Sequence, residues 1–174
     1  MIGPFAAECT GGQLFTLAQE TAQDWWEVEA LFDTCFAPGR TALSSYRLRE
    51  DVAPVVALCR VARDDQGILG GAIRYWPVRI GSTPALLLGP VAVHPTAQGE
   101  GLGAALIRDT LARAGEAGHE RVLLVGDEPY YRRFGFTKLS GIDMPPPTNA
   151  DRILGHDLRP DAWHGLRGLV TRAD

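Results

Sequence analysis

The first part of the chain carries apolar patterns that predict one strand and two helices. The run Leu14–Ala18 is mostly apolar and predicts a short strand. The next apolar residues recur every three or four positions, as on one helix face; they are Trp25, Val28, Phe32 and Cys35. Thr21 and Asp24 have the spacing of a helix N-terminus, and Ala37-Pro38-Gly39 ends the pattern. A shorter helix is predicted over Ala42–Glu50.

The middle of the chain predicts three consecutive strands. The runs Val55–Ala62, Ile68–Arg79 and Ala85–Val93 are rich in apolar residues and are separated by turn residues at 64–67 and 81–84. A Gly70-Gly71 pair inside the second run indicates a bulge. The third run is almost wholly apolar, which is typical of a strand covered on both faces. Because the connections are short, we expect an antiparallel meander.

A glycine-rich stretch then separates a strand from an amphipathic helix. Gly99–Gly103 opens a helix whose apolar face extends to Ala114 and which ends at Gly115 and Gly118. A short apolar strand over Arg121–Gly126 follows. The order strand, loop, helix, strand is that of a crossover unit, so the two strands are predicted to be parallel.

The last part of the chain has weaker patterns. Asp127–Arg133 predicts a short helix, with Asp127 as its cap and Pro129 in its first turn. Phe134-Gly135-Phe136 leads into another strand, and Pro145-Pro146-Pro147 excludes a helix there. A final strand is predicted over Gly165–Arg172.

Composition and charge narrow the class of protein. A chain of 174 residues suits one domain, so residues 1–174 are predicted to fold as one. The 17 basic and 21 acidic residues form no basic stripe, which disfavours a nucleic-acid partner. No apolar run approaches the roughly 20 residues that span a bilayer, and no signal peptide is recognised, so we expect a cytoplasmic protein without a membrane partner.

The cysteines and histidines predict neither disulfides nor a metal. Cys9, Cys35 and Cys59 are far apart and odd in number, as expected of free thiols in a reducing compartment. None of the four histidines has metal-ligand spacing with another ligand.

The glycine loop has the chemistry of an anion site. Gly99, Gly101 and Gly103 lack a Cβ and sit at a predicted helix N-terminus, where backbone N–H groups are unpaired, so a phosphate or pyrophosphate could approach closely. The alternative is that the glycines only allow a tight turn and close packing. The spacing Gly99-x-Gly101-x-x-Ala104, with Asp127 beyond it, also matches a dinucleotide-binding fingerprint. Against that alternative, His94–Gln98 separate the strand from the first glycine, and too few residues follow to complete a doubly wound sheet.

Three motifs in this region resemble one known family. Gln98-Gly99-Glu100-Gly101-Leu102-Gly103-Ala104 resembles the acyl-CoA signature Gln/Arg-x-x-Gly-x-Gly/Ala of the GNAT superfamily of N-acetyltransferases. Gly89–Pro95 is similar to the family's fourth strand, and Tyr131–Phe136 resembles its Tyr-x-x-Leu/Phe-Gly-Phe segment. The motifs occur in the family's order over about Leu86–Leu139. The sequence Tyr-Tyr-x-Arg-Phe-Gly-Phe at residues 130–136 resembles a bacterial subgroup whose substrates are largely unassigned.

The resemblance implies a fold and an activity. The fold is an α/β (α+β) domain with a mixed, largely antiparallel central sheet, flanking helices and a split between two parallel strands, Val91–Val93 and Val122–Val125. The activity is transfer of an acetyl group from acetyl-CoA to a primary amine by direct attack in a ternary complex, without a metal. Homodimer formation is expected by analogy only. A non-catalytic acyl-CoA-binding sensor is the alternative from another class.

The resemblance also implies roles for individual residues. Backbone N–H groups are expected to hold the pyrophosphate; they belong to Gln98, Gly99, Glu100, Gly101, Leu102, Gly103 and Ala104. The segment Val91, Ala92 and Val93 is expected to hold the pantetheine arm, with the backbone of Val91 and Val93 pairing to it like an added strand. Tyr131 takes the place of the general acid and also contacts the cofactor. A tyrosine has an ordinary pKa near 10 and a thiol one near 8.5, so Tyr131 stays protonated and can donate to the leaving sulfur. The alternative for Tyr131 is aromatic packing between helix and sheet.

The sequence identifies neither the general base nor the residues that bind the acceptor. The proton of the amine can leave through a carboxylate, a histidine or a water relay. Candidates for the base are His94, Glu100, Asp127 and Glu128, although a turn, solvent exposure or helix capping is the favoured explanation for each of them. Acceptor specificity is expected from the first two helices and the loops near Pro145–Pro147. The Trp25-Trp26 pair and Trp76 either line that pocket or pack in the core.

Overall fold

The structure is a computed structural model that describes residues 5–8 and 14–173. Its strands are β1 (Phe5–Glu8), β2 (Leu14–Gln19), β3 (Arg60–Arg63), β4 (Leu69–Ile80), β5 (Thr83–Val93), β6 (Arg121–Val125), β7 (Thr137–Lys138), β8 (Ile142–Asp143), β9 (Ile153–Asp157) and β10 (Gly168–Arg172). Its α-helices are α1 (Trp25–Phe36), α2 (Ser44–Arg47), α3 (Leu102–Glu116) and α4 (Glu128–Tyr131), with short 3₁₀ turns between elements.

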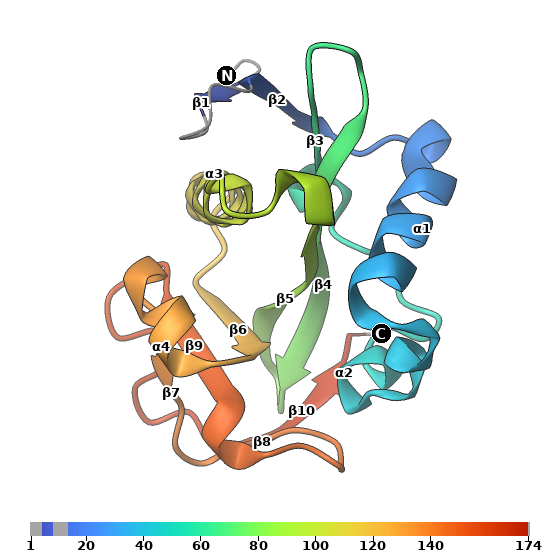
Figure 1. Cartoon of the computed structure of the whole chain (residues 1–174). Coiled ribbons are helices and arrows are strands. Elements are labelled where there is room, and N and C mark those ends of the chain that lie inside the picture. Colours follow the sequence, from blue (N-terminus) through green and yellow to red (C-terminus); the bar gives the residue numbers. More distant parts are fainter. Residues whose placement is uncertain (1–4, 9–13, 174) are drawn as a thin grey trace.

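The strands form one mixed sheet in the order β1-β2-β3-β4-β5-β6-β9-β7, with β10 beside the far end of β4. Along this order every neighbouring pair is antiparallel except β5 and β6, which are parallel. Figure 1 shows α3 and α1 on opposite sides of the central strands, so that β4 and β5 are covered on both faces. The nearly continuous apolar sequence of β5 follows from that double cover.

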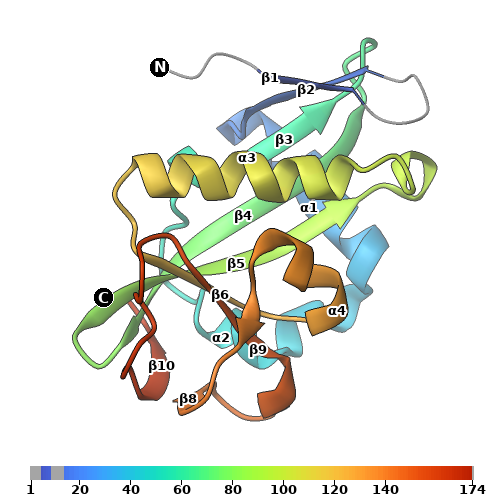
Figure 2. The ribbon, with the colours of Figure 1, turned by 90° about the vertical axis from the view of Figure 1, so that its left-hand side faces the viewer.

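The parallel pair separates after two residues. β5 and β6 are paired only at Leu86 with Val122 and at Leu87 with Leu123. Beyond this point β5 runs on to Val93 toward α3 while β6 turns away to α4, and the two strands diverge in Figure 2. The predicted split is therefore present, but it begins beyond Leu123, so Val122 lies in the paired part.

A bulge in β5 marks the start of the split. On the β4 side, Tyr75 opposes Leu88 and Ile73 opposes Val91, so two residues of β5, Gly89 and Pro90, face one residue of β4. Gly89 has a φ of 128°, a backbone conformation that a residue with a side chain rarely adopts. The bulge therefore lies just beyond the two residues of β5 that pair with β6.

Several sequence predictions are confirmed by this fold. Strand β2, helix α1 and strands β4, β5 and β6 lie where the apolar patterns place them. Asp24 accepts a hydrogen bond from the Thr21 backbone N–H at 2.7 Å, as in a capping box. The register between β3 and β4 shifts at Gly70, which confirms the predicted bulge.

Other predictions were wrong in extent. Of the strand predicted over Val55–Ala62, the first half is a 3₁₀ turn at Val56–Leu58, because only Leu58 of that turn is buried and the apolar run has no strand partner there. The helix predicted over Ala42–Glu50 covers only Ser44–Arg47. The last strand begins at Gly168 rather than Gly165. Strands β1, β8 and β9 were not predicted, and β9 matters most because it pairs along all of β6.

Candidate active site

The loop Gln98–Ala104, called the cradle below, presents free backbone at the start of α3. Gly99 and Gly101 each have a φ of 84°, and an added Cβ at either would meet no atom within 4 Å. Gly101 is the N-cap of α3, and no side chain of the described residues caps it. The N–H groups of the first turn are therefore open to an anion, together with the positive end of the helix dipole.

A groove runs from the cradle to the aromatic segment after β6. It is lined by Val93, by the cradle residues except Glu100, and by Ala97, Tyr130 and Arg133. The guanidinium of Arg133 lies 4.1 Å from the centre of the Tyr130 ring, which holds a positive charge beside the cradle. The sequence reasoning did not assign Arg133 a role, although it lies inside one of the motifs.

The backbone of β5 points into the split at alternate residues. The N–H of His94 donates to the Gly70 carbonyl at 2.8 Å, so that pair is hydrogen-bonded across the β4–β5 ladder. Alternation then directs the N–H and C=O of Ala92 toward β4, and those of Val91 and Val93 away from it. The Val93 carbonyl accepts instead from the Gln98 side chain at 3.1 Å and from the Cys35 thiol at 3.4 Å. Val91 and Val93 thus offer backbone groups on the side where β6 has left the sheet.

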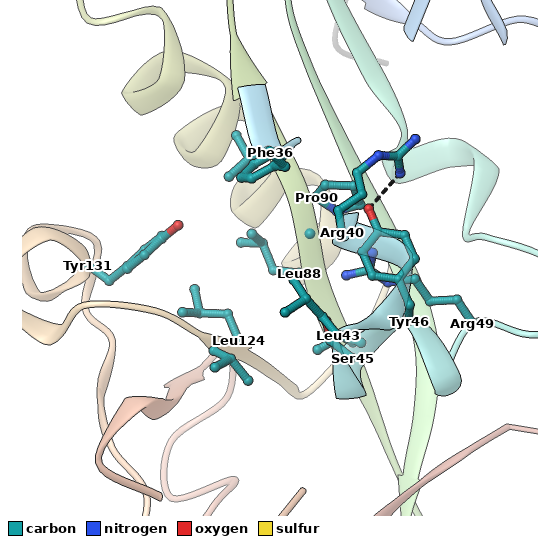
Figure 3. Close-up of a pocket in the computed structure, with 14 residues that line it drawn as sticks. Phe36, Arg40, Leu43, Ser45, Tyr46, Arg49, Leu88, Pro90, Leu124 and Tyr131 are labelled. Atoms are coloured by element: carbon teal, nitrogen blue, oxygen red, sulfur yellow. Dashed lines mark hydrogen bonds between the residues drawn. The ribbon is translucent and has the colours of Figure 1, made fainter. Parts of the chain in front are cut away.

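A second cavity, called the Tyr131 pocket below, lies at the opposite end of this edge (Figure 3). Its volume is about 160 Å³. Its lining residues are Phe36, Arg40, Leu43, Ser45, Tyr46, Arg49, Leu87, Leu88, Gly89, Pro90, Val91, Leu124, Val125 and Tyr131. One wall is therefore the split in the sheet, and the other is the α1–α2 region. The sequence analysis placed acceptor specificity in the first two helices and in the loops near Pro145–Pro147, and Pro145–Pro147 does not line this pocket.

Tyr131 projects into this pocket with its hydroxyl leading, as Figure 3 shows. Its ring makes edge contacts with Tyr130 at 4.9 Å and Phe136 at 5.9 Å between centroids. Burial raises the pKa of Tyr131 to about 12, with smaller contributions in the same direction from Tyr130 and Asp127. The phenol is thus protonated throughout the physiological range.

The four candidates for the base lie outside the Tyr131 pocket. His94 accepts from the Thr96 N–H at 3.2 Å and caps a 3₁₀ turn. Asp127 pairs with Arg152 at 3.3 Å, and Glu128 pairs with Arg132 at 3.0 Å. Glu100 is half-buried in the cradle loop, and its Oε2 has no hydrogen-bond partner. No carboxylate or imidazole of the described residues lines the pocket.

The tryptophans and cysteines are placed as follows. Trp25 and Trp26 are exposed, and neither they nor Trp76 line the Tyr131 pocket. Trp76 is half-buried and packs against a core cluster that includes Val170 of β10. Cys35 and Cys59 are free thiols, while Cys9 lies outside the described residues.

Comparisons with known proteins identify the family. Residues 56–138 match the model of the acetyltransferase (GNAT) domain. The chain is 32% identical over 149 residues to the uncharacterized N-acetyltransferase YhbS of Escherichia coli K12, and the match spans 82% of this chain and 87% of the relative. The chain belongs to the GNAT family of acetyltransferases. The resemblance seen in the sequence motifs is therefore confirmed, and with it the GNAT fold class.

Two solved GNAT structures extend the comparison. Escherichia coli YhbS in complex with CoA superposes with a TM-score of 0.80 at 27% identity, covering 96% of this chain and 91% of that one. A GNAT acetyltransferase from Brucella melitensis in complex with acetyl-CoA gives a TM-score of 0.70 at 29% identity, covering 91% of this chain and 96% of that one.

Within the described part of this GNAT chain, no helix has the length and apolarity to cross a membrane. The same residues contain no group of three or more His, Cys, Asp or Glu side chains placed to hold a metal ion.

Proposed function

We propose that this GNAT acetyltransferase moves an acetyl group from acetyl-CoA to a primary amine by direct attack in a ternary complex. One observation carries the proposal: the outward-facing backbone of Val91 and Val93 joins the cradle at one end to the Tyr131 pocket at the other. An elongated substrate with an anionic end and a reactive end fits such a path. The CoA and acetyl-CoA complexes of the two similar structures support the same assignment.

In this proposal the cradle holds the pyrophosphate. The open N–H groups of the first turn of α3 face an anion, and Arg133 adds a cation beside them. Gly103 leaves room for the phosphates, because any side chain there would extend into the groove next to Tyr130. The pantetheine arm then pairs with the outward backbone of Val93 and Val91, replacing the β6 strand that has turned away.

The reacting carbonyl comes to rest at the Tyr131 pocket. The Val91 N–H can polarise the thioester oxygen as negative charge develops on it. The amine nitrogen forms the new C–N bond, the C–S bond breaks, and the departing sulfur takes the Tyr131 hydroxyl proton. The amine gives up its proton to water, since the residues lining the pocket include no carboxylate or imidazole. Solvent then restores the proton of Tyr131.

The remaining proposals concern the protein as a whole. We propose that residues 1–174 form one domain, supported by a single sheet that includes both β1 and β10. We also propose a cytoplasmic location, which the free thiols Cys35 and Cys59 support. Homodimer formation stays a prediction from family analogy.

Calorimetry and a turnover assay test the function. Acetyl-CoA is titrated into the protein, and thiol release is followed with polyamines, amino acids, aminoglycosides and peptide N-termini. We expect binding of acetyl-CoA and release of CoA thiol that depends on the amine. Absence of binding at near-millimolar acetyl-CoA would contradict the proposal that acetyl-CoA is the acetyl donor. Binding without amine-dependent release from any acceptor would favour the non-catalytic sensor.

A further inference from the structure

Arg49 brings to the Tyr131 pocket a guanidinium that has no carboxylate partner in the described part of the chain. Its Nε and Nη1 are buried and have no hydrogen-bond partner. Its Nη2 lies 3.5 Å from the position that a Cβ on Gly89 would occupy, beside the bulge of β5. Figure 3 shows the side chain passing along the Tyr46 ring, with the guanidinium ending between that ring and the strand.

The two nearby buried arginines are fully paired, which sets Arg49 apart. Arg40 bonds Glu29 at 2.5 Å, Asp33 at 2.8 Å and the Tyr46 hydroxyl at 2.7 Å. Arg74 bonds Glu20 at 2.6 Å and Glu29 at 2.5 Å. No carboxylate of the described residues forms an ion pair with Arg49. Its contacts are the faces of Tyr46 at 4.2 Å and Trp76 at 5.9 Å.

An unpaired buried cation weakens the free protein and favours an anionic ligand. Burial, with smaller contributions from the charges of Arg40 and Arg74, lowers the pKa of Arg49 to about 10, and Tyr46 offsets part of this effect. The group is still protonated at neutral pH, so its charge is held out of water without a counterion. Such a perturbed group at a cavity is typical of a binding site.

We propose that Arg49 binds a carboxylate of the acceptor, so that the substrate is a small molecule carrying both a primary amine and a carboxylate. This inference rests on the acetyl-transfer function proposed above. Arg49 and Tyr131 line the same cavity, so one acceptor can reach both groups. Its amine then faces the thioester beside Val91 and Tyr131, while its carboxylate lies against Arg49.

The shape and charge of the pocket favour a carboxylate over a phosphate. The free edge of a guanidinium matches a carboxylate in a bidentate pair. Arg49 supplies one positive charge, and Arg40, the other cation of the lining, already pairs with two carboxylates. The remaining wall is mostly apolar, from Phe36, Leu43 and Leu124 among others.

Matched acceptors test the inference through the release of CoA thiol. Each of three carboxylate acceptors is compared with an analogue that lacks the carboxylate: leucine with leucinamide, phenylalanine with phenylalaninamide, and 5-aminopentanoate with pentylamine. Phosphoethanolamine is the acceptor that carries a phosphate instead. For at least one pair, kcat/KM for the carboxylate is expected to exceed that of its uncharged partner by about tenfold or more, in keeping with a lost charged hydrogen bond. Equal rates within every pair, or a preference for phosphoethanolamine, would overturn the proposal.

Arg49→Met separates a binding role from a structural one. We expect it to raise KM for the preferred carboxylate about tenfold or more and to leave KM for the uncharged partner unchanged. Arg47→Met, at the exposed end of α2 two residues before Arg49, should keep the wild-type preference. Because the substitution removes an unpaired buried charge, Tm of the free protein should stay equal or rise. A lower Tm together with an equal loss for both acceptors would make Arg49 structural.

A binding measurement distinguishes failure of this inference from failure of the proposed function. If wild-type protein acetylates none of these amines, each carboxylate is added to the CoA-saturated protein and Tm is measured. A rise in Tm with a carboxylate, absent with its amide and absent in Arg49→Met, supports the Arg49 site even without turnover. No rise with any carboxylate would contradict it.

Discussion

The ring of Tyr131 lies directly against the backbone of Gly126, so closely that a Cβ added at Gly126 would come within 2.5 Å of Tyr131 Cε2. Gly126 follows β6, and its N–H is held by the Arg152 carbonyl at 2.9 Å. The absence of a side chain at residue 126 therefore lets the phenol enter the Tyr131 pocket. This relationship connects the end of β6 with the residue proposed as the acid.

Gly126→Ala should lower turnover without weakening cofactor binding. The added methyl displaces the Tyr131 ring, and a displacement near 1 Å at a catalytic group can cost about 100-fold in rate. The cradle lies on another element, so the Kd for acetyl-CoA from calorimetry should not change. Gly115→Ala, where a Cβ meets no atom within 4 Å, is the matched control. Wild-type kcat in Gly126→Ala would show that the position of Tyr131 is unimportant.

Gly103→Leu should weaken acetyl-CoA binding. Gly103 lies in the first turn of α3 and lines the cradle groove, so a leucine there occupies the space proposed for the phosphates. We expect Kd to rise roughly tenfold or more, because open backbone N–H groups at a helix start need close approach. Gly115→Leu near the end of the same helix should keep the wild-type Kd. Equal Kd values for acetyl-CoA in the two variants would contradict the proposal that the cradle binds the pyrophosphate.

Activity should not decline at alkaline pH through loss of the Tyr131 proton. Burial raises the pKa of Tyr131 to about 12, so the protonated acid persists above the usual tyrosine range near 10. The free-base fraction of the amine grows as pH rises. For an amine without a carboxylate, a profile of kcat/KM is therefore expected to rise and then level off up to about pH 10. An alkaline fall that begins near pH 9 and vanishes in Tyr131→Phe would contradict this reading.

Glu29→Gln should destabilise the protein near neutral pH. Burial raises the pKa of Glu29, but hydrogen bonds from Arg40 and Arg74 outweigh it, and the net pKa falls below its ordinary value of 4.5. A lowered folded pKa contributes stability above pH 4.5, and that contribution disappears as pH falls through the folded value. Urea unfolding at pH 7 should show a loss of roughly 1.5–3 kcal/mol.

The control and the pH series sharpen that test. Glu27→Gln, on the same helix with a side chain 57% exposed, should cost less than about 1 kcal/mol. The difference between wild type and Glu29→Gln should shrink as the pH is lowered from about 5 to 3. A difference that does not change with pH would show that the charge of Glu29 is not what stabilises α1 against β4.

The elements that the sequence predicted are those with strong local patterns. Helix α3 has a regular apolar face bounded by glycines, and β5 is a continuous apolar run, so each could be recognised alone. β9 could not, because its five residues gain their strand conformation by pairing with β6, including Leu123 with Gly155. Such long-range pairing leaves little trace in the local pattern.

The residues of the candidate site likewise include some that the sequence could point to and some that it could not. The cradle glycines and Tyr131 lie in contiguous motifs, so the resemblance could point to them. Arg49 could not be singled out, because its importance arises from burial beside Tyr46 and from the pairing of Arg40 and Arg74 with other groups. The base candidates came from position along the chain, and the structure places all of them outside the Tyr131 pocket.

The most direct measurement pairs kcat with the Kd for acetyl-CoA in Tyr131→Phe, using an amine that the wild type acetylates. Removing the proton that Tyr131 gives to the departing sulfur should lower kcat by about 100-fold or more, while the Kd from calorimetry stays within about twofold of wild type. Unchanged kcat in Tyr131→Phe would contradict the assignment of Tyr131 as the acid of acetyl transfer.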